Sequence, residues 1–379
     1  MSPSATPRPR LQSLDSLRGL VVLGMILVNS AAYLFYAAQK PIWPWLLHAH
    51  WQGFLPADWV FPAFVLMVGL SIGYVMPDYQ AGGRLTPAGL GRHANRAVRL
   101  LLIGLVLSNL YWLADPSAHV ARLPGVLQRL ALVFFAVVVV HLTLGRRTHI
   151  GVILALLLGY WGILSLPLRG GIATDLSVPG QNWQGLIDRL VFGPYIFVKG
   201  PLGYDPEGLL STLPAIAQGL IGALIGTRLR EQPATLAQSR SLALLGTAIL
   251  IGGLIWGLIH PISKDLWTGS YVALTTGLTL LVLALFHALE DARGEPSGLG
   301  LPQPLANLLK AFGINALFAY VLHYLASILL LAKAWDFLFV PLSGVITPEG
   351  ASFVIVLAFI GLNAWVMLFL KSKSCQIKL

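Results

Sequence analysis

Two histidines in a segment rich in tryptophan are the first candidates for chemistry. His48 and His50 lie in Leu47-His-Ala-His-Trp-Gln-Gly53, shortly before Asp58. Imidazole titrates near neutral pH, so a histidine at a partly dry interface suits general-base or acyl-acceptor chemistry, and a nearby carboxylate can fix its tautomer. Asp58 has a structural alternative, because proline followed by an acid often begins a helix. The histidines form no HxxxH pair, so we predict no metal site.

Polar residues inside apolar stretches are a second group of candidates. Asn29 lies about halfway through the apolar stretch 19–39. Asn315 and His323 are eight residues apart in the stretch 311–332, which puts them roughly on one helix face. Polar groups within a membrane span are costly and are candidates for function; the alternative is a hydrogen bond between helices.

Basic residues supply a third group. Arg92, Arg96 and Arg99 follow an i, i+4, i+7 pattern, which places them on one helix face. Such a face binds lipid headgroups or, alternatively, a phosphorylated cosubstrate. Arg129 follows Gln128 and lies five residues inside the span that would start at Pro124, where an arginine must pair, bind an anion or extend to the membrane edge.

The composition identifies the solvent that these residues meet. Of 379 residues, 56% are hydrophobic and only 11% are charged, and the mean hydropathy is +0.76. Soluble chains carry about 25% charged residues, so this one is predicted to be a polytopic membrane protein. A cytosolic enzyme, a secreted disulfide scaffold and a nucleic-acid-binding module are excluded. Cys375, the single cysteine, excludes an intramolecular disulfide.

Charge-free stretches predict an all-α fold of about ten transmembrane helices in a single domain over 1–379. The stretches are 19–39, 59–77, 100–114, 130–145, 148–168, 208–227, 241–263, 266–289, 311–332 and 350–370. With the segment 1–17 inside, the 25 lysines and arginines divide 17 inside to 8 outside, which predicts cytoplasmic N- and C-termini. A signal peptide is the alternative for the first stretch, which is long for one.

Two predicted outer segments are unusual. Segment 40–57 contains three prolines and three tryptophans, including Trp51, so it cannot form one helix and should lie at the interface or dip inward. Segment 169–207 is a long connection of the kind that is often functional. It ends with Asp205 and Glu207, which could hold a cationic or polyhydroxylated substrate, or begin a helix.

Several of these residues fall in blocks that resemble the catalytic domain of the heparan-α-glucosaminide N-acetyltransferase family. The blocks are Leu14-Asp-Ser-Leu-Arg-Gly19 with Val28-Asn29, His48-Ala-x-Trp51-x-Gly53, Ala57-Asp58-x-x-Phe61-Pro62-x-Phe64-Val65, Pro124-Gly-Val-Leu-Gln-Arg-Leu130, Asp205-Pro-Glu-Gly208, Lys264-Asp-Leu-Trp-Thr-Gly-Ser-Tyr271, and Gly313-Ile-Asn315 with His323.

The resemblance implies a polytopic enzyme that uses cytosolic acetyl-CoA to acetylate the amino group of a terminal glucosamine across the membrane. It implies His48 as the catalytic histidine and Asn29 as its partner. The chain looks most like shorter bacterial members, which implies the bacterial inner membrane, and family analogy makes a homodimer possible.

We therefore expect a transmembrane acetyltransferase in which His48 deprotonates the amine or carries the acetyl group. Asn29 would donate to the oxyanion and Asp58 would orient His48. The expected substrate-binding residues are Trp51, Asp205, Glu207, Asn315 and His323. The expected acetyl-CoA-binding residues are Gln128, Arg129, Arg92, Arg96 and Arg99. Membrane lipids are the other expected partners.

The rival hypothesis is a permease for N-acetylglucosamine or a related sugar, in which the same aromatic and acidic residues bind sugar without acetyl transfer. A transporter should show internal repeats around a midplane site. We find no repeat, and the polar candidates gather at one predicted face, which favours the enzyme.

Overall fold

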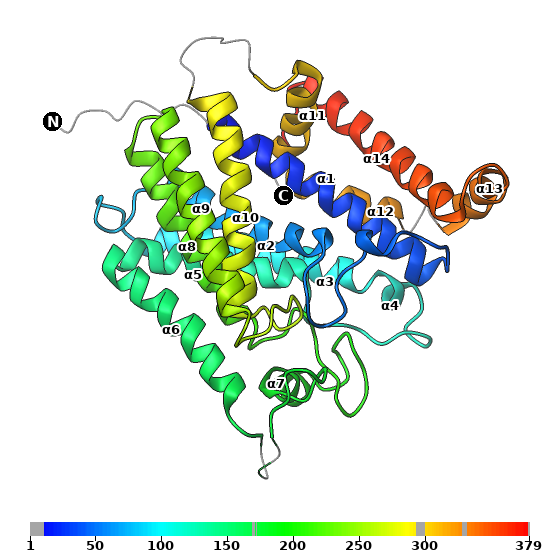
Figure 1. The fold of residues 1–379 in the computed structure, drawn as a ribbon, viewed down its shortest axis with the longest axis horizontal. Helices are drawn as coiled ribbons and strands as arrows, with labels where there is room; N and C mark the ends of the chain where they lie inside the picture. The colour runs from blue at the N-terminus through cyan, green and yellow to red at the C-terminus, as the bar shows by residue number, and fades with distance from the viewer. Residues whose placement is uncertain (1–10, 169–170, 172, 293–299, 328–331, 378–379) are drawn as a thin grey trace.

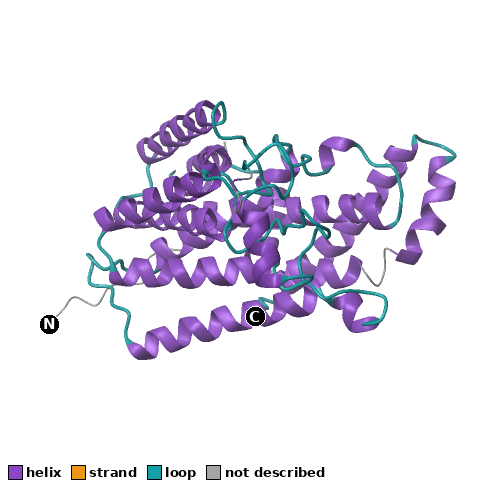
Figure 2. Cartoon of the chain, turned by 90° about the horizontal axis from the view of Figure 1, so that it is seen from below, coloured by secondary structure: helices purple, strands orange, loops and turns teal. Residues whose placement is uncertain are grey.

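The computed structural model describes residues 11–168, 171, 173–292, 300–327 and 332–377. These residues form helices and connecting segments with one isolated β-bridge, between Val198 and Tyr204 (Figure 2). In chain order the helices are α1 (Gln12–Ala32), η1 (Tyr33–Ala37), η2 (Pro44–Leu46), η3 (Pro56–Trp59), α2 (Val60–Val75), α3 (Pro87–Ser108), α4 (Leu110–Ala114), α5 (Val126–Thr143), α6 (Arg146–Ser165), α7 (Trp183–Phe192), α8 (Thr212–Glu231), α9 (Leu236–Trp256), α10 (Gly269–Phe286), η5 (His287–Asp291), α11 (Gln303–Ile314), α12 (Ala316–Ala326), α13 (Ala332–Ser343) and α14 (Pro348–Ser372).

Polar caps define where several of these helices begin. A side-chain oxygen that accepts a hydrogen bond from an early backbone N–H satisfies a donor that the helix leaves unpaired. Residues in this role precede α3, α7, α9, α10 and α14; they are Thr86, Asn182, Thr235, Thr268 and Thr347. Short polar caps therefore mark where these five helices begin.

Eight helical segments are long and apolar enough to cross a membrane, which confirms an all-α polytopic membrane protein. They are Gln12–Ala37, Pro56–Val75, Val126–Thr143, Arg146–Ser165, Thr212–Glu231, Leu236–Trp256, Gly269–Asp291 and Pro348–Ser372. A ninth arises if α11 and α12, bent by 86°, count as one broken span. Figure 1 shows α8, α9 and α10 together on one side and α14 on the other.

The structure differs from the predicted count of ten at segment 100–114, which is divided between α3 and α4. Arg92, Arg96 and Arg99 all lie in the N-terminal part of α3. Every stretch of α3 that is long enough to cross a membrane therefore includes three arginines, and α3 is not counted as a span. Helix α1 begins at Gln12, within the predicted inner segment 1–17; residues 1–10 of that segment lie outside the described part of the chain.

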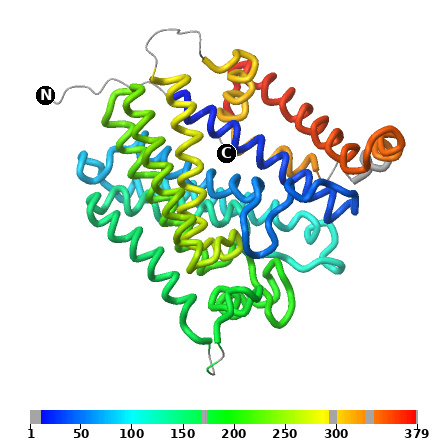
Figure 3. The backbone as a smooth tube through the Cα atoms, viewed as in Figure 1, coloured from blue at the N-terminus to red at the C-terminus, as the bar shows by residue number. Residues whose placement is uncertain are grey.

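The first part of α1 and the C-terminal segment both bond to residues at the break between α11 and α12; Figure 3 traces the chain from one end to the other. Arg18 of α1 donates to the carbonyl oxygen of Gly313 (3.3 Å). Asn315, which lies at the break, donates to the carbonyl oxygen of Cys375 (3.1 Å) and accepts from the backbone N–H of Ile377 (2.9 Å). Both ends therefore lie at the same end of the bundle, which we call the terminal end.

The two unusual segments pack against each other at the opposite end, which we call the loop end. The Trp51 indole and the Gln52 amide both donate to the carbonyl oxygen of Leu176, each at 2.8 Å. The ring of Trp51 contacts that of Tyr204 edge-on, with centroids 4.8 Å apart. Segment 40–57 and segment 169–207 thus form one layer over the helix ends; residues 169, 170 and 172 of the second lie outside the described residues.

Candidate active site

A hydrogen bond joins His48 to Asp58 at the loop end. His48 Nδ1 lies 2.8 Å from Asp58 Oδ1, and Asp58 is fully buried whereas the His48 side chain keeps 35% exposure. The other Asp58 oxygen accepts from the backbone N–H groups of Ala49 (3.1 Å) and Leu55 (2.9 Å). Because Asp58 accepts the Nδ1 proton, the neutral imidazole has Nε2 available as a base.

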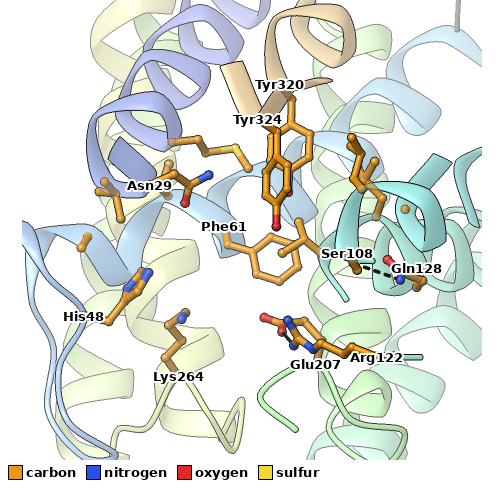
Figure 4. A pocket seen from close by; sticks show the side chains of 18 residues that line it. Asn29, His48, Phe61, Ser108, Arg122, Gln128, Glu207, Lys264, Tyr320 and Tyr324 are labelled. Carbon is orange, nitrogen blue, oxygen red and sulfur yellow. Dashed lines mark hydrogen bonds and ion pairs between the residues drawn. The ribbon is translucent and has the colours of Figure 1, made fainter. Parts of the chain in front are cut away.

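His48 lies at the edge of a cavity of about 170 Å³, which we call the outer cavity. It is lined by five helices, α1, α2, α3, α5 and α12, by segment 40–57, and by single residues from three connecting segments: Arg122 before α5, Glu207 before α8 and Lys264 before α10. Figure 4 shows the polar side chains around it. They are Asn29, His48, Ser108, Arg122, Gln128, Glu207, Lys264, Tyr320 and Tyr324. Elements far apart in sequence therefore supply the polar side chains of one cavity.

Asn29 faces the outer cavity and is held from behind by His323. Asn29 Nδ2 lies 3.0 Å from His323 Nε2, and the His323 side chain is fully buried. His323 does not line the outer cavity, so the structure places it behind Asn29 rather than beside a substrate. Asn315 lies at the bend between α11 and α12, away from both Asn29 and His323. Asn315 and His323 therefore do not act at one common place, as their spacing had predicted.

Asp205 and Glu207 are bound by an arginine that the sequence did not single out. The guanidinium of Arg122 donates to both oxygens of Asp205, at 2.9 and 2.6 Å, and also to Glu207. Asp205 is fully buried and accepts from the backbone N–H of Phe197 (2.9 Å) as well, so it holds the loop together. Only Glu207 of the two carboxylates lines the outer cavity.

Gln128 and Arg129 are adjacent in sequence but lie in different surroundings. Gln128 lines the outer cavity and donates to Ser108 (3.3 Å). Arg129 is buried and donates to the carbonyl oxygen of Gly208 (3.2 Å) and the hydroxyl of Ser211 (2.5 Å). Its guanidinium also lies 4.9 Å from the Trp267 ring centroid. Arg129 therefore supports the start of α8 and lines neither of the two cavities described here.

The three arginines of α3 lie at the terminal end, around a second cavity of about 650 Å³. This inner cavity is lined by Arg18 together with Arg92, Arg96 and Arg99. The Arg96 guanidinium lies 4.7 Å from the Phe134 ring centroid. Asn315 also lines the inner cavity.

The inner and outer cavities adjoin along the bundle. Leu127 lines both of them. On α2 the outer cavity reaches Phe61 and the inner one Phe64, and on α3 they reach Gly104 and Leu100 respectively. Each pair is about one helical turn apart, so the two spaces succeed each other along the same helices.

Trp51 also lies away from both cavities, because its buried ring joins the two loop-end segments. Arg122, Lys264, Tyr320 and Tyr324 line the outer cavity although the sequence did not mark them as site residues. Lys264 falls within a family-like block, which was the available signal. Arg122 lies in a loop, and Tyr320 and Tyr324 lie on α12. Their place in the cavity depends on packing against segments far away in sequence, which the local sequence does not reveal.

The electrostatics of the outer cavity favour an uncharged His48. Burial and the positive charge of Lys264 hold the pKa of His48 below its usual value, although Asp58 acts to raise it. Burial alone would raise the pKa of Glu207, but Arg122 and Lys264 keep it below its usual value, so Glu207 is a carboxylate. The cavity therefore combines a neutral imidazole with a paired anion.

Comparison with known proteins agrees with the family-like blocks. A family model described as the catalytic part of heparan-alpha-glucosaminide N-acetyltransferase matches residues 10–186. The human protein of that name is 29% identical over 84% of this chain and the mouse protein 27% identical over 83%. The chain covers 53% of each relative, about half their length. The predicted resemblance is thus confirmed: over residues 10–186, nearly half of its length, the chain is similar to the catalytic part of heparan-α-glucosaminide N-acetyltransferases, and the similarity to the human and mouse proteins extends over most of its length.

Proposed function

We propose that this protein is a transmembrane acetyltransferase that moves an acetyl group from acetyl-CoA to the amino group of a glucosamine-type sugar. The observation that carries the proposal is the Asp58–His48 pair: Asp58 bonds to Nδ1 of His48, and the His48 side chain lines a cavity that Asn29 also lines. The acetyl group and the amino-sugar class of acceptor are inferred from the names of the matching relatives.

The geometry assigns a role to each of these three side chains. The amine attacks the acetyl carbonyl carbon, a C–N bond forms, and His48 Nε2 takes the amine proton. Asp58 stabilises the resulting imidazolium, and the Asn29 amide donates to the oxyanion that develops on the acetyl oxygen. The C–S bond then breaks, and the thiolate of CoA leaves and is protonated.

Glu207 and the phenols of Tyr320 and Tyr324 are available to the acceptor. They lie across the outer cavity from His48 and present a carboxylate and two hydroxyl groups (Figure 4). Sugars are bound by such hydrogen-bonding groups beside aromatic rings. We assign these residues, rather than Trp51, Asp205, Asn315 or His323, to contact with the sugar.

Arginines of the inner cavity fit the phosphates of acetyl-CoA. Four guanidinium groups, those of Arg18, Arg92, Arg96 and Arg99, surround a space large enough for a polyatomic anion, and guanidinium binds phosphate in bidentate fashion. With the termini in the cytoplasm, as the charge distribution predicts, this cavity lies on the side of cytosolic acetyl-CoA. The acyl arm would pass Leu127 to reach His48.

Transfer of labelled acetyl from acetyl-CoA to glucosamine by the purified protein tests the function. We expect label in the sugar. Retained binding of acetyl-CoA without label in any amino sugar would refute the acceptor class. Sugar uptake into proteoliposomes that needs no acetyl-CoA and survives His48→Ala would establish the permease instead.

The role of the inner cavity gives a separate prediction. Arg96→Gln and Arg99→Gln should each raise the KM for acetyl-CoA roughly tenfold, because a charge-assisted hydrogen bond contributes about 1.5 kcal/mol. The KM for the sugar should not change. Steady-state kinetics with each substrate varied in turn provide the measurement.

Arg147→Gln is the matched control, since Arg147 is exposed near the terminal end and lines neither cavity. It should leave both KM values unchanged. If the KM for acetyl-CoA is unaffected in all three variants, the arginines of α3 bind lipid headgroups and the cosubstrate enters elsewhere.

A further inference from the structure

A turn between α9 and α10 brings a lysine to the outer cavity. The backbone N–H of Trp267 donates to the carbonyl oxygen of Lys264 (3.1 Å), and that of Thr268 to the carbonyl oxygen of Ser263 (3.2 Å). The Ser263 hydroxyl donates to the carbonyl oxygen of Trp51 (2.5 Å), so the turn is bonded to the segment that carries His48. The segments that carry Lys264 and His48 are thus held together by a hydrogen bond.

The turn is held rigidly enough to fix where Lys264 lies. Trp267 has φ +51°, a left-handed conformation that is unfavourable for a bulky residue and persists only when its surroundings impose it. The Trp267 ring is fully buried, and its indole N–H donates to Gln218 (3.1 Å). The Gln184 amide donates to the carbonyl oxygen of Asp265 (2.8 Å).

Lys264 differs from the other charged residues near His48 because its side chain has no partner among the described residues. Asp265 accepts a hydrogen bond from the Tyr204 hydroxyl (3.1 Å), and Glu207 is paired with Arg122. No hydrogen bond or ion pair of the Lys264 ammonium is found within the described residues. In Figure 4 its side chain rises into the space between His48 and Glu207.

We propose that Lys264 is an electrostatic residue of the active site, whose ammonium keeps His48 unprotonated and so able to accept the proton of the acceptor amine. The need for such a residue follows from the geometry. Asp58 fixes the tautomer of His48, but its negative charge also favours the imidazolium, which cannot act as a base. A cation fixed nearby offsets that effect without disturbing the hydrogen bond.

The charges around His48 are consistent with this balance. Asp58 and Asp265 act to raise the pKa of His48, whereas burial and, next in size, Lys264 act to lower it, and the net direction is downward. Elsewhere around the cavity, Arg122 and Glu207 are paired with each other, and the remaining polar groups are the uncharged side chains Asn29, Ser108, Gln128, Tyr320 and Tyr324.

Carbethoxylation of His48 by diethylpyrocarbonate, followed against pH by peptide mass spectrometry, tests the inference. The reagent attacks only unprotonated imidazole, and the 35% exposure of His48 leaves it accessible. In Lys264→Gln and Lys264→Met the midpoint of modification should move to higher pH. In Lys264→Arg, which keeps the charge, it should stay at the wild-type value.

Two controls separate the charge of Lys264 from general effects. Lys199→Gln removes an exposed lysine of the same loop layer and should leave the His48 midpoint unchanged. His119, which is exposed, serves as the internal reference, and the extent of its modification should be the same in every variant. An unchanged His48 midpoint in both neutral variants, or an equal shift in Lys264→Arg, would overturn the proposal.

The effect on rate rests on the proposed acetyl transfer, but the protonation of His48 does not. The acidic limb of kcat/KM should move to higher pH in Lys264→Gln, and a limb displaced by about one pH unit lowers kcat/KM about tenfold at a fixed pH on that limb. A shifted titration with no transfer by the wild type would refute the function alone. Normal transfer with an unshifted titration would refute the role of Lys264 alone.

Discussion

Replacing His48 with alanine is expected to reduce acetyl transfer by a factor on the order of 100 to 10,000, the range supplied by a well-placed general base. The reason is geometric, because His48 joins the fully buried Asp58 to the outer cavity and no other imidazole lines that cavity among the described residues. Initial rates of labelled transfer at saturating acetyl-CoA provide the measurement. Binding of acetyl-CoA should be retained.

His50→Ala is the matched control. His50 lies two residues away in the same loop, but it is exposed and does not line the outer cavity. Its replacement should leave the rate within about twofold of wild type. Comparable losses in both variants would mean that the loop, rather than the His48 imidazole, determines activity.

Asp58→Asn should also lower the rate of acetyl transfer. The amide cannot accept at both positions, so either the bond to His48 or those to Ala49 and Leu55 must be lost.

Rapid-quench trapping in the wild type separates two routes of acetyl transfer, one through an acyl-histidine and one directly to the sugar. Label on His48 before the sugar is added indicates an acyl-histidine, and its absence with normal turnover indicates direct transfer.

Local sequence was sufficient to predict the pairing partners that lie close together in the chain. His48 and Asp58 are ten positions apart in the chain. Pro56 begins the short helix η3, in which Asp58 lies within hydrogen-bond distance of His48. The all-α membrane fold followed equally directly, because long apolar stretches have few alternatives in a bilayer. Both inferences depend on chain-local constraints.

Partners that are distant in sequence could not be predicted in the same way. Arg122 is separated from Asp205 by 83 residues, and nothing in the local pattern around Arg122 distinguishes it from an ordinary loop arginine. The bend at Asn315 has a similar cause: the Asn315 side chain bonds to the backbone of Cys375 and Ile377, 60 and 62 residues away, at the point where the helix does not continue straight. Tertiary contacts decide these positions.

Helix packing gives the second large prediction, which concerns α2 and α8. Gly69 and Gly73 on α2 face Gly222 and Gly226 on α8, the small-xxx-small arrangement that allows close approach of membrane helices. A Cβ atom at Gly69 would lie 1.8 Å from the carbonyl oxygen of Gly219, and one at Gly222 would lie 2.2 Å from that of Leu66. Backbone atoms cannot move aside as a side chain can, so the helices must separate.

Gly69→Ala and Gly222→Ala should therefore each lower the unfolding temperature in detergent sharply and reduce acetyl transfer. The separation would also shift Phe61 on α2 and Glu207, just before α8, which both line the outer cavity. The control is Gly162→Ala on α6, where no heavy atom lies within 4 Å of the added Cβ. Alanine favours a helix by about 1 kcal/mol over glycine, so this variant should be as stable as wild type or more so. Because the same chemical change is expected to have opposite effects, equal unfolding temperatures in the three variants would show that α2 and α8 are not in close contact and that the outer cavity is held open by other helices.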